Sequence, residues 1–204
     1  ACAEVTFAGE QKLDAYRDAL ADHAEECRRM LTLINTMLEI SRTEAGGASL
    51  HPENFDLAGL LRHSIELFQM VAEQKGLTVV AELPDGPMFF WGDRMKIQQL
   101  FGNLIDNAVK FTPPGGKIDI TLRETPKQLI FSVTDTGPGI AEADRDHVFK
   151  RFYRADSSRN QPGNGLGLSL VQTVARAHGG AVELTGAPGG GSCFTVFLPL
   201  QPQV

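Results

Sequence analysis

Three short segments contain residue types that suit a phosphorylated, metal-complexed ligand. In the first, Asn103 and Asn107 are four residues apart and Lys110 follows three residues later. On a helix this spacing places all three side chains on one face. Two carboxamide oxygens and an ammonium suit a magnesium-bound polyphosphate, because magnesium takes few protein oxygens and keeps its phosphate ligands. A solvated polar helix face with one buried asparagine explains the same spacing equally well.

The second segment begins at Asp135, which ends a run of alternating residues typical of a strand. A carboxylate at a strand end can accept a hydrogen bond from the exocyclic amine of adenine. Gly137 and Gly139 would let the backbone approach the base without a Cβ clash. The alternative is an ordinary Asp-Thr-Gly-Pro-Gly turn.

The third segment carries Gly163, Gly165 and Gly167 before a predicted helix over residues 166–178. Backbone N–H groups and the positive helix end at such a place favour an anion. No Gly-Lys-Ser/Thr follows, which excludes a P-loop. The segment does not open a βαβ unit near the first strand, which excludes a Rossmann fingerprint.

Residues 141–162 separate the last two segments and end in a polar, loop-like stretch. Within them, Arg154 is the best candidate to reach a terminal phosphate and stabilise its charge. The alternative is a surface ion pair between Arg154 or Lys150 and one of the nearby acids, Asp144, Asp146 or Asp156.

The surrounding elements predict a two-layer α/β sandwich, because helices and mostly antiparallel strands fall in segregated blocks. The helices are expected over residues 57–75, 94–111 and 166–178, and the strands over residues 77–83, 88–91, 117–123, 128–134, 182–185 and 192–198.

Residues 10–44 predict one long helix with two interleaved heptad series. The series, here called the heptad stripe, are Leu13, Leu20, Cys27 and Ile34, and Tyr16, His23, Met30 and Met37. The repeat favours a dimeric helical bundle, although packing on the chain's own domain remains an alternative. Gly46-Gly47 ends the pattern and predicts a domain boundary between residues 47 and 48.

The composition limits the classes of partner. The chain has 204 residues, 42% of them hydrophobic, and a formal charge of −6. This charge argues against a nucleic-acid surface, and no apolar run approaches the length of a membrane span. The cysteines, Cys2, Cys27 and Cys193, show neither metal nor disulfide spacing and favour a reducing compartment.

Taken together, the three segments resemble the nucleotide site of sensor histidine kinases, within the wider family of gyrase, Hsp-type chaperone and MutL ATPases. The resemblance implies a Bergerat-type ATP-binding fold that binds ATP and Mg²⁺. It makes Asn107 the metal ligand, Lys110 a phosphate contact and Asp135 the residue that recognises adenine. The implied catalytic residues are Asn103, Asn107, Lys110 and Arg154, and the implied nucleotide-binding residues are Asp135, Gly137, Gly139, Phe152, Gly163, Gly165, Leu166 and Gly167.

The resemblance also divides the chain. Residues 1–47 look like part of the dimerisation bundle, mainly its second helix, and residues 48–204 look like the catalytic domain, with an ATP lid at about 141–162. The family's acceptor histidine precedes an acidic residue, and none of His23, His51, His63, His147 and His178 has that context. We therefore expect the acceptor upstream of residue 1, so that this chain alone would not phosphorylate itself.

The implied function is transfer of the γ-phosphoryl group of ATP to that histidine, for relay to a response-regulator receiver domain. The implied protein is a homodimer, and this chain is its cytoplasmic portion, in a bacterial inner-membrane sensor, without membrane contact of its own. Hydrolysing relatives have a glutamate where Asn103 stands, and an amide cannot act as a general base, which favours transfer over hydrolysis. The alternative is a nucleotide-binding regulatory module or ATPase of the same fold without kinase activity.

Overall fold

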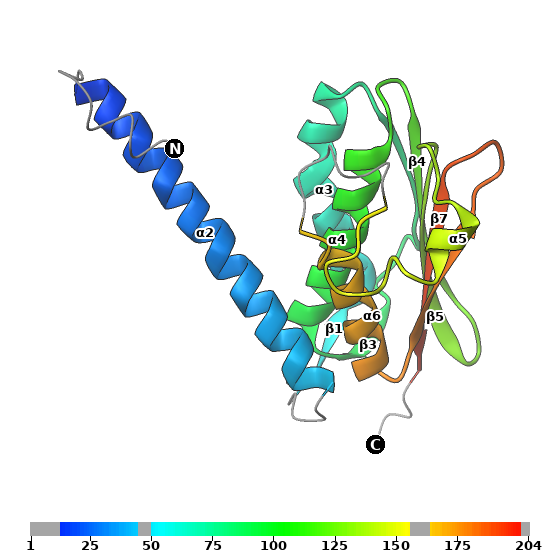
Figure 1. Ribbon diagram of the computed structural model, residues 1–204. Coiled ribbons are helices and arrows are strands. Elements are labelled where there is room, and N and C mark those ends of the chain that lie inside the picture. The colour runs from blue at the N-terminus through cyan, green and yellow to red at the C-terminus, as the bar shows by residue number, and fades with distance from the viewer. Residues whose placement is uncertain (1–12, 45–49, 156–163, 201–204) are drawn as a thin grey trace.

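A five-stranded sheet forms one layer of the protein, and α3, α4 and α6 cover one of its faces (Figure 1). The computed structural model describes residues 13–44, 50–155 and 164–200. Its elements in chain order are α2 (Leu13–Glu44), β1 (Glu53–Asp56), α3 (Leu57–Gln74), β2 (Thr78–Glu82), β3 (Phe89–Gly92), α4 (Arg94–Phe111), β4 (Lys117–Glu124), β5 (Gln128–Asp135), α5 (Glu142–Arg145), α6 (Gly167–Ala177), β6 (Ala181–Gly186) and β7 (Ser192–Pro199).

The sheet has the strand order β2-β4-β5-β7-β6, and β1 pairs with β3 in a separate two-stranded ribbon. The pairs β4–β5, β5–β7 and β6–β7 are antiparallel, whereas β2 runs parallel to β4. Alternate residues of the central strands point into the core, as the period of a half-buried strand requires. Leu122, Phe131 and Val196 are neighbours in register and almost fully buried.

Helix α4 is held against the sheet by a continuous apolar face. Phe101 is fully buried, and its ring centroid lies 4.6 Å from that of Phe131 on β5. Burial of a side chain of this size contributes about 1.5–3 kcal/mol. The other buried residues of α4 are Ile97, Leu100, Leu104, Ile105, Ala108 and Val109. This face fixes the rotation of α4 about its own axis.

Both ends of α4 are fixed by polar contacts. At the N-terminus, Asp93 Oδ1 accepts a hydrogen bond from the Lys96 N–H at 3.1 Å, a regular N-cap. At the C-terminus, Lys75 Nζ donates to the carbonyls of Val109 and Lys110, at 2.8 and 2.7 Å. These carbonyls have no partner within the helix, so Lys75 satisfies groups that α4 leaves open.

The N-terminus of α4 is also joined to the C-terminus of α6 through a buried histidine. His178 Nε2 accepts the backbone N–H of Asp93 at 3.0 Å, and its Nδ1 lies 2.8 Å from the Val174 carbonyl. Nδ1 must therefore carry the proton and Nε2 must be unprotonated. Burial, the largest cause, and the charge of Lys96 lower the pKa of His178, and together they outweigh the hydrogen bond to Val174 and the charge of Asp93, which raise it.

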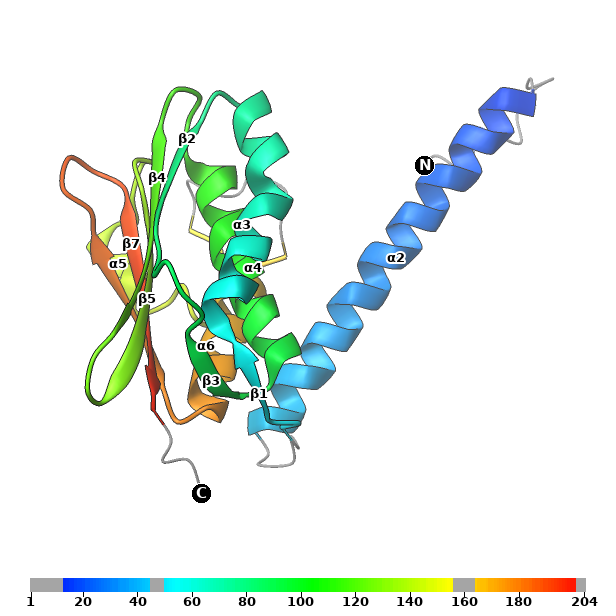
Figure 2. The ribbon, with the colours of Figure 1, turned by 180° about the vertical axis from the view of Figure 1, so that it is seen from behind.

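Helix α2 extends away from the two-layer body and touches it near its C-terminal end (Figure 2). Ile40 is fully buried there, and Leu33 packs against the same core. The described side chains of the heptad stripe are exposed, among them Leu20, Met30 and Ile34 at 70%, 53% and 55%. The side chain of Leu13 lies outside the described residues.

The fold predicted from the sequence is confirmed, including the long N-terminal helix and the two-layer α/β arrangement. Two short elements were not predicted, β1 and α5, each of four residues. Such short runs contain too few residues for a hydrophobic period to be recognised.

We predict that His178 makes the protein less stable in mild acid. A lowered pKa in the folded state means that the unfolded chain binds the proton first, below its value of 6.5. The free energy of unfolding should therefore fall below pH 6.5, by at most about 1.4 kcal/mol per pH unit from this group. Urea titrations between pH 7.5 and 5.5 measure the slope.

The variant His178→Gln removes the titrating group and should flatten this slope, although it lowers stability at all pH values. His63→Gln, on the exposed surface of α3, controls for the loss of an imidazole that is not buried. The pKa of Asp93 is lowered, so this carboxyl stays ionised between pH 7.5 and 5.5 and does not contribute to the measured slope. Equal slopes for wild type and His178→Gln would refute the assignment.

Candidate functional site

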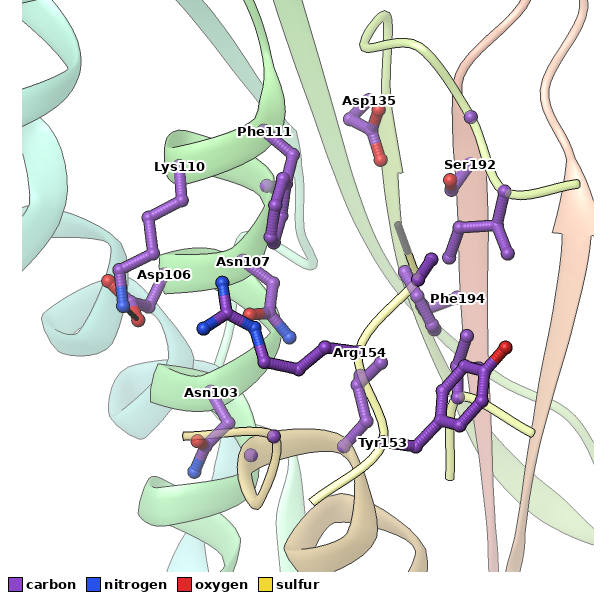
Figure 3. Close-up of a pocket in the computed structure, with 18 of the residues that line it drawn as sticks. Asn103, Asp106, Asn107, Lys110, Phe111, Asp135, Tyr153, Arg154, Ser192 and Phe194 are labelled. Carbon is purple, nitrogen blue, oxygen red and sulfur yellow. Dashed lines mark hydrogen bonds and ion pairs between the residues drawn. The ribbon is translucent and has the colours of Figure 1, made fainter. Parts of the chain in front are cut away.

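A cavity of about 320 Å³ lies between α4, the end of β5 and the segments on either side of residues 156–163 (Figure 3). Its lining residues are Asn103, Asp106, Asn107, Ala108, Lys110, Phe111, Asp135, Pro138, Gly139, Ile140, Val148, Tyr153, Arg154, Ala155, Asn164, Gly165, Gly167, Leu168, Ser192 and Phe194. All three segments singled out in the sequence contribute to this one cavity.

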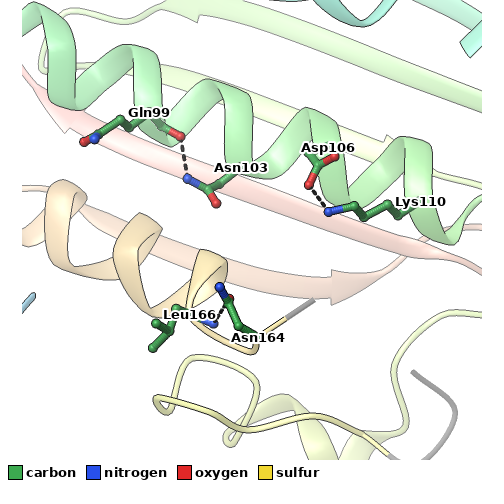
Figure 4. Close-up of polar contacts among 6 residues, drawn as sticks. All are labelled: Gln99, Asn103, Asp106, Lys110, Asn164 and Leu166. Atoms are coloured by element: carbon green, nitrogen blue, oxygen red, sulfur yellow. Dashed lines mark hydrogen bonds and ion pairs between the residues drawn. The ribbon is translucent and has the colours of Figure 1, made fainter. Parts of the chain in front are cut away.

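The polar face of α4 forms one wall. Asn103, Asn107 and Lys110 lie on successive turns, opposite the buried face of the helix (Figure 3). Asn103 Nδ2 donates to the Gln99 carbonyl at 2.8 Å (Figure 4), which orients its amide. A Cβ added at Gly167 would lie 2.7 Å from Asn103 Oδ1, so the absence of a side chain at Gly167 leaves room for this amide.

Lys110 has a partner that was not predicted. Its ammonium forms an ion pair with the carboxylate of Asp106, one turn earlier on the same helix (Figure 4). Both side chains are about one-third exposed, 34% for Lys110 and 37% for Asp106. The sequence signal for this pair was the four-residue Asp–Lys spacing on a predicted helix.

Asp135 lies at the opposite end of the cavity, where β5 ends (Figure 3). It is only 6% exposed, and its Oδ1 accepts the Gly137 N–H at 2.7 Å. Burial raises the pKa of Asp135, and the backbone hydrogen bonds from Gly137 and Ser192 oppose this rise without cancelling it. The carboxylate is therefore poorly solvated, and a further hydrogen-bond donor would stabilise its ionised form.

The glycines after Asp135 allow close contacts between backbone segments. A Cβ at Gly137 would lie 2.8 Å from the Phe111 carbonyl oxygen, and Gly137 does not line the cavity. Gly139 does line it, has φ +71°, and lies against the backbone of Gly191. The sequence analysis explained these glycines by the approach of the backbone to a base. The structure adds a second reason for glycine at these positions, because this loop packs closely on α4 and on the β6–β7 turn.

The segment before α6 meets the cavity at Gly165, which has φ +69° and accepts the Phe152 N–H at 2.9 Å. Leu166 is buried and does not line the cavity; its N–H donates to Asn164 Oδ1 at 3.1 Å. One N–H at the start of α6 is therefore already used. Gly163 lies outside the described residues.

The predicted lid is described only up to Ala155. The Tyr153 hydroxyl donates a hydrogen bond to Asp144 of the α5 segment. The rings of Tyr153 and His147 form a T-shaped pair with centroids 5.6 Å apart. Tyr153 and Arg154 line the cavity, and Figure 3 shows the Arg154 side chain extending from this segment toward α4. Phe152 does not line it: the residue is 56% exposed and has φ +60°.

Several lining residues were not predicted, because their contribution depends on contacts between distant segments. Ser192 and Phe194 come from β7, which neighbours β5 in the sheet, and Phe111 is the last residue of α4. No sequence signal marked them, since each belongs to an ordinary helix or strand pattern.

Two general features complete the description. Among the described residues, no helix combines the length and apolar character needed to cross a bilayer. The same part of the chain holds no group of three or more His, Cys, Asp or Glu side chains arranged for a metal ion.

Comparisons with known proteins agree with this geometry. Residues 92–202 match the family described as Histidine kinase-, DNA gyrase B-, and HSP90-like ATPase. The chain is 36% identical over 175 residues to the sensor histidine kinase RppB of Synechocystis, covering 85% of this chain and 38% of that protein. It is 34% identical over 209 residues to the sensor protein SphS of Synechococcus elongatus, covering 94% and 50%.

Solved structures give the same result. A mycobacterial sensor histidine kinase, MprB, has a TM-score of 0.64 at 30% identity, covering 74% of this chain and 99% of that one. Full-length ShkA in complex with AMPPNP has a TM-score of 0.80 at 29% identity, covering 96% and 41%. The chain spans half or less of the length of the two curated relatives RppB and SphS. Because the matched segment contains α4, Asp135 and the glycines before α6, the chain belongs to the family of histidine kinase-, DNA gyrase B- and HSP90-like ATPases.

Proposed function

We propose that this chain is the catalytic ATP-binding part of a sensor histidine kinase. The observation that carries the proposal is the single cavity in which the α4 amides, the buried Asp135 and the start of α6 come together. The kinase names of the relatives favour this function over a regulatory module that binds nucleotide without transfer. In this division, residues 1–47 belong to the dimerisation bundle and residues 48–204 to the catalytic domain, with the lid at about 141–162.

The residues fit adenine at the Asp135 end. A carboxylate that is 6% exposed and has a raised pKa gains most from a donor brought by a ligand. The exocyclic amine of adenine is such a donor. Val148, Ile140 and Phe194 offer apolar surface in the same cavity for the faces of the base.

The residues also fit the phosphates and Mg²⁺ at the α4 end. Asn107 presents a carboxamide on the cavity wall, the hard oxygen ligand that magnesium accepts together with phosphate oxygens. The metal, when bound, neutralises phosphate charge. Arg154 and Lys110 supply positive charge from two sides, and Gly165 and Gly167 line the wall where α6 begins.

Transfer then depends on positioning. The Pγ–O bond to ADP breaks as a P–N bond forms with an imidazole of the acceptor, and ADP leaves. Asn103 cannot remove a proton from water. The Gln99 carbonyl orients its amide, and the absence of a side chain at Gly167 leaves room for it at the wall. An amide at this position therefore favours transfer to a protein nucleophile over hydrolysis.

The partners follow from the resemblance and the exposed heptad stripe. We propose a homodimer through a bundle that covers the exposed side chains of α2, and a response-regulator receiver domain as the next phosphoryl acceptor. We further propose that the chain is the cytoplasmic portion of a bacterial inner-membrane sensor. The charge of −6 gives no reason to expect nucleic acid as a partner.

Asp135→Asn is predicted to separate nucleotide affinity from stability. ATP and ADP should bind more weakly by roughly 1.5–3 kcal/mol, because a hydrogen bond to a charged group is lost. The apo protein should become slightly more stable at pH 7.5, because a carboxylate with a raised pKa costs free energy when ionised in the fold. Calorimetric titration and thermal unfolding measure the two effects.

Asp119→Asn, on the half-exposed side of β4, is the control and should change neither quantity appreciably. Lowering the pH toward the raised pKa of Asp135 should weaken nucleotide binding to wild type more than binding to the Asp135→Asn variant. Equal affinities of wild type and Asp135→Asn at pH 7.5 would remove adenine recognition from this residue.

The chain is predicted to bind ATP with Mg²⁺ and yet take up no phosphoryl label from γ-labelled ATP on its five histidines. Joining a first bundle helix with an acceptor histidine to residue 1 should produce an acid-labile, alkali-stable label. In that extended protein, Asn107→Ala should abolish the label through loss of the metal ligand, whereas Asn54→Ala on exposed β1 should not. Stoichiometric label on His23, which lies exposed on α2, would overturn the assignment of the acceptor.

A further inference from the structure

The ion pair between Asp106 and Lys110 lies on the wall of the cavity, where the phosphates of a nucleotide are expected (Figures 3 and 4). Asp106 and Asp135 are the two acidic residues among the described residues that line this cavity. Asp135 lies across the cavity from α4, whereas Asp106 lies on α4 together with Asn107 and Lys110 (Figure 3).

Stability does not explain the pair. Both side chains are about one-third exposed, and pairs of this spacing on a helix contribute little to folding. The helix is already fixed by its buried face, by Asp93 at one end and by Lys75 at the other. Asp106 is therefore free to act on the ligand rather than on the fold.

Its charge has two consequences for an anionic ligand. The carboxylate holds the Lys110 ammonium, so a phosphate must compete for that cation. The carboxylate also repels the phosphate directly, and this repulsion grows with the net charge of the ligand. Uncomplexed ATP carries about twice the negative charge of its Mg²⁺ complex, so the uncomplexed form suffers more on both counts.

We propose that Asp106 is a specificity-determining residue that disfavours nucleotide without its metal ion, by holding Lys110 and by repelling uncompensated phosphate charge. The inference rests on the proposed function, because it needs the phosphates at this wall. It assigns a role to a residue that the sequence interpretation passed over between two candidate site residues.

The test compares Asp106→Asn with wild type in four calorimetric titrations, of ATP and ADP, each with excess Mg²⁺ and with EDTA. For the variant, ATP with EDTA should bind roughly three- to tenfold more tightly, and ATP with Mg²⁺ by less than about twofold. ADP with EDTA should show a smaller gain than ATP. The gain should shrink as salt is raised, because exposed charges are screened.

Two further variants separate the action of Asp106 on Lys110 from its direct repulsion. Lys110→Met should weaken ATP in EDTA, and in that background Asp106→Asn should retain only part of its effect. Asp119→Asn breaks another Asp–Lys pair of similar exposure, with Lys117 on β4 outside the cavity lining, and should leave all four affinities unchanged.

Each remaining outcome decides the question. Weaker binding of Mg²⁺–ATP by Asp106→Asn would overturn the proposal and make Asp106 a support of the metal site. Unchanged affinities in Mg²⁺ and in EDTA would also overturn it. Absence of ATP binding by wild type would instead refute the proposed function itself, so the two failures are distinguishable.

Discussion

The site depends on one constraint, the fixed rotation of α4 against the sheet. Phe101 on Phe131, together with the rest of the apolar face, allows only one side of this helix to meet the core. The opposite side is then committed to the cavity wall, with Asn103 and Asn107 one turn apart. A rotation by one residue, about 100°, would bury these amides with too few hydrogen-bond partners, which is costly.

The ends of α4 link this constraint to the rest of the molecule. Asp93 joins its start to His178 at the end of α6, and α6 begins at the cavity. Lys75 closes its last turn, beside Phe111, whose carbonyl lies against Gly137 and the Asp135 loop. The Asp135 end of the cavity, the wall proposed to meet the phosphates and the start of α6 are thus held by contacts that all meet on α4.

The sequence predicted what depends on local patterns. The helix and strand periods located α4, β4, β5 and α6 nearly to the residue, and the four-residue spacing of Asn103 and Asn107 predicted their common face. It could not predict contacts between segments that only the fold brings together. The pairing of β2 beside β4, the contribution of Ser192 and the approach of Phe111 to Gly137 are of this kind.

The Asp106–Lys110 pair shows a different limit. Its spacing was visible, but an ordinary surface pair and a pair on a ligand-binding wall look identical in sequence. Only the rotation of α4 decides between them. Phe152, which the resemblance implies as a nucleotide-binding residue, is more than half exposed and lies outside the cavity lining, so its contact with a nucleotide stays a prediction.

In the proposed function, one cavity holds a whole nucleotide, with adenine at Asp135 and phosphates at the polar face of α4. The decisive measurement is a crystal structure of the chain with Mg²⁺ and a non-hydrolysable ATP analogue. We expect the exocyclic amine within hydrogen-bond distance of the Asp135 carboxylate, and a metal ion on the Asn107 side-chain oxygen. An analogue bound in the reverse orientation, or bound outside this cavity, would rule out this arrangement.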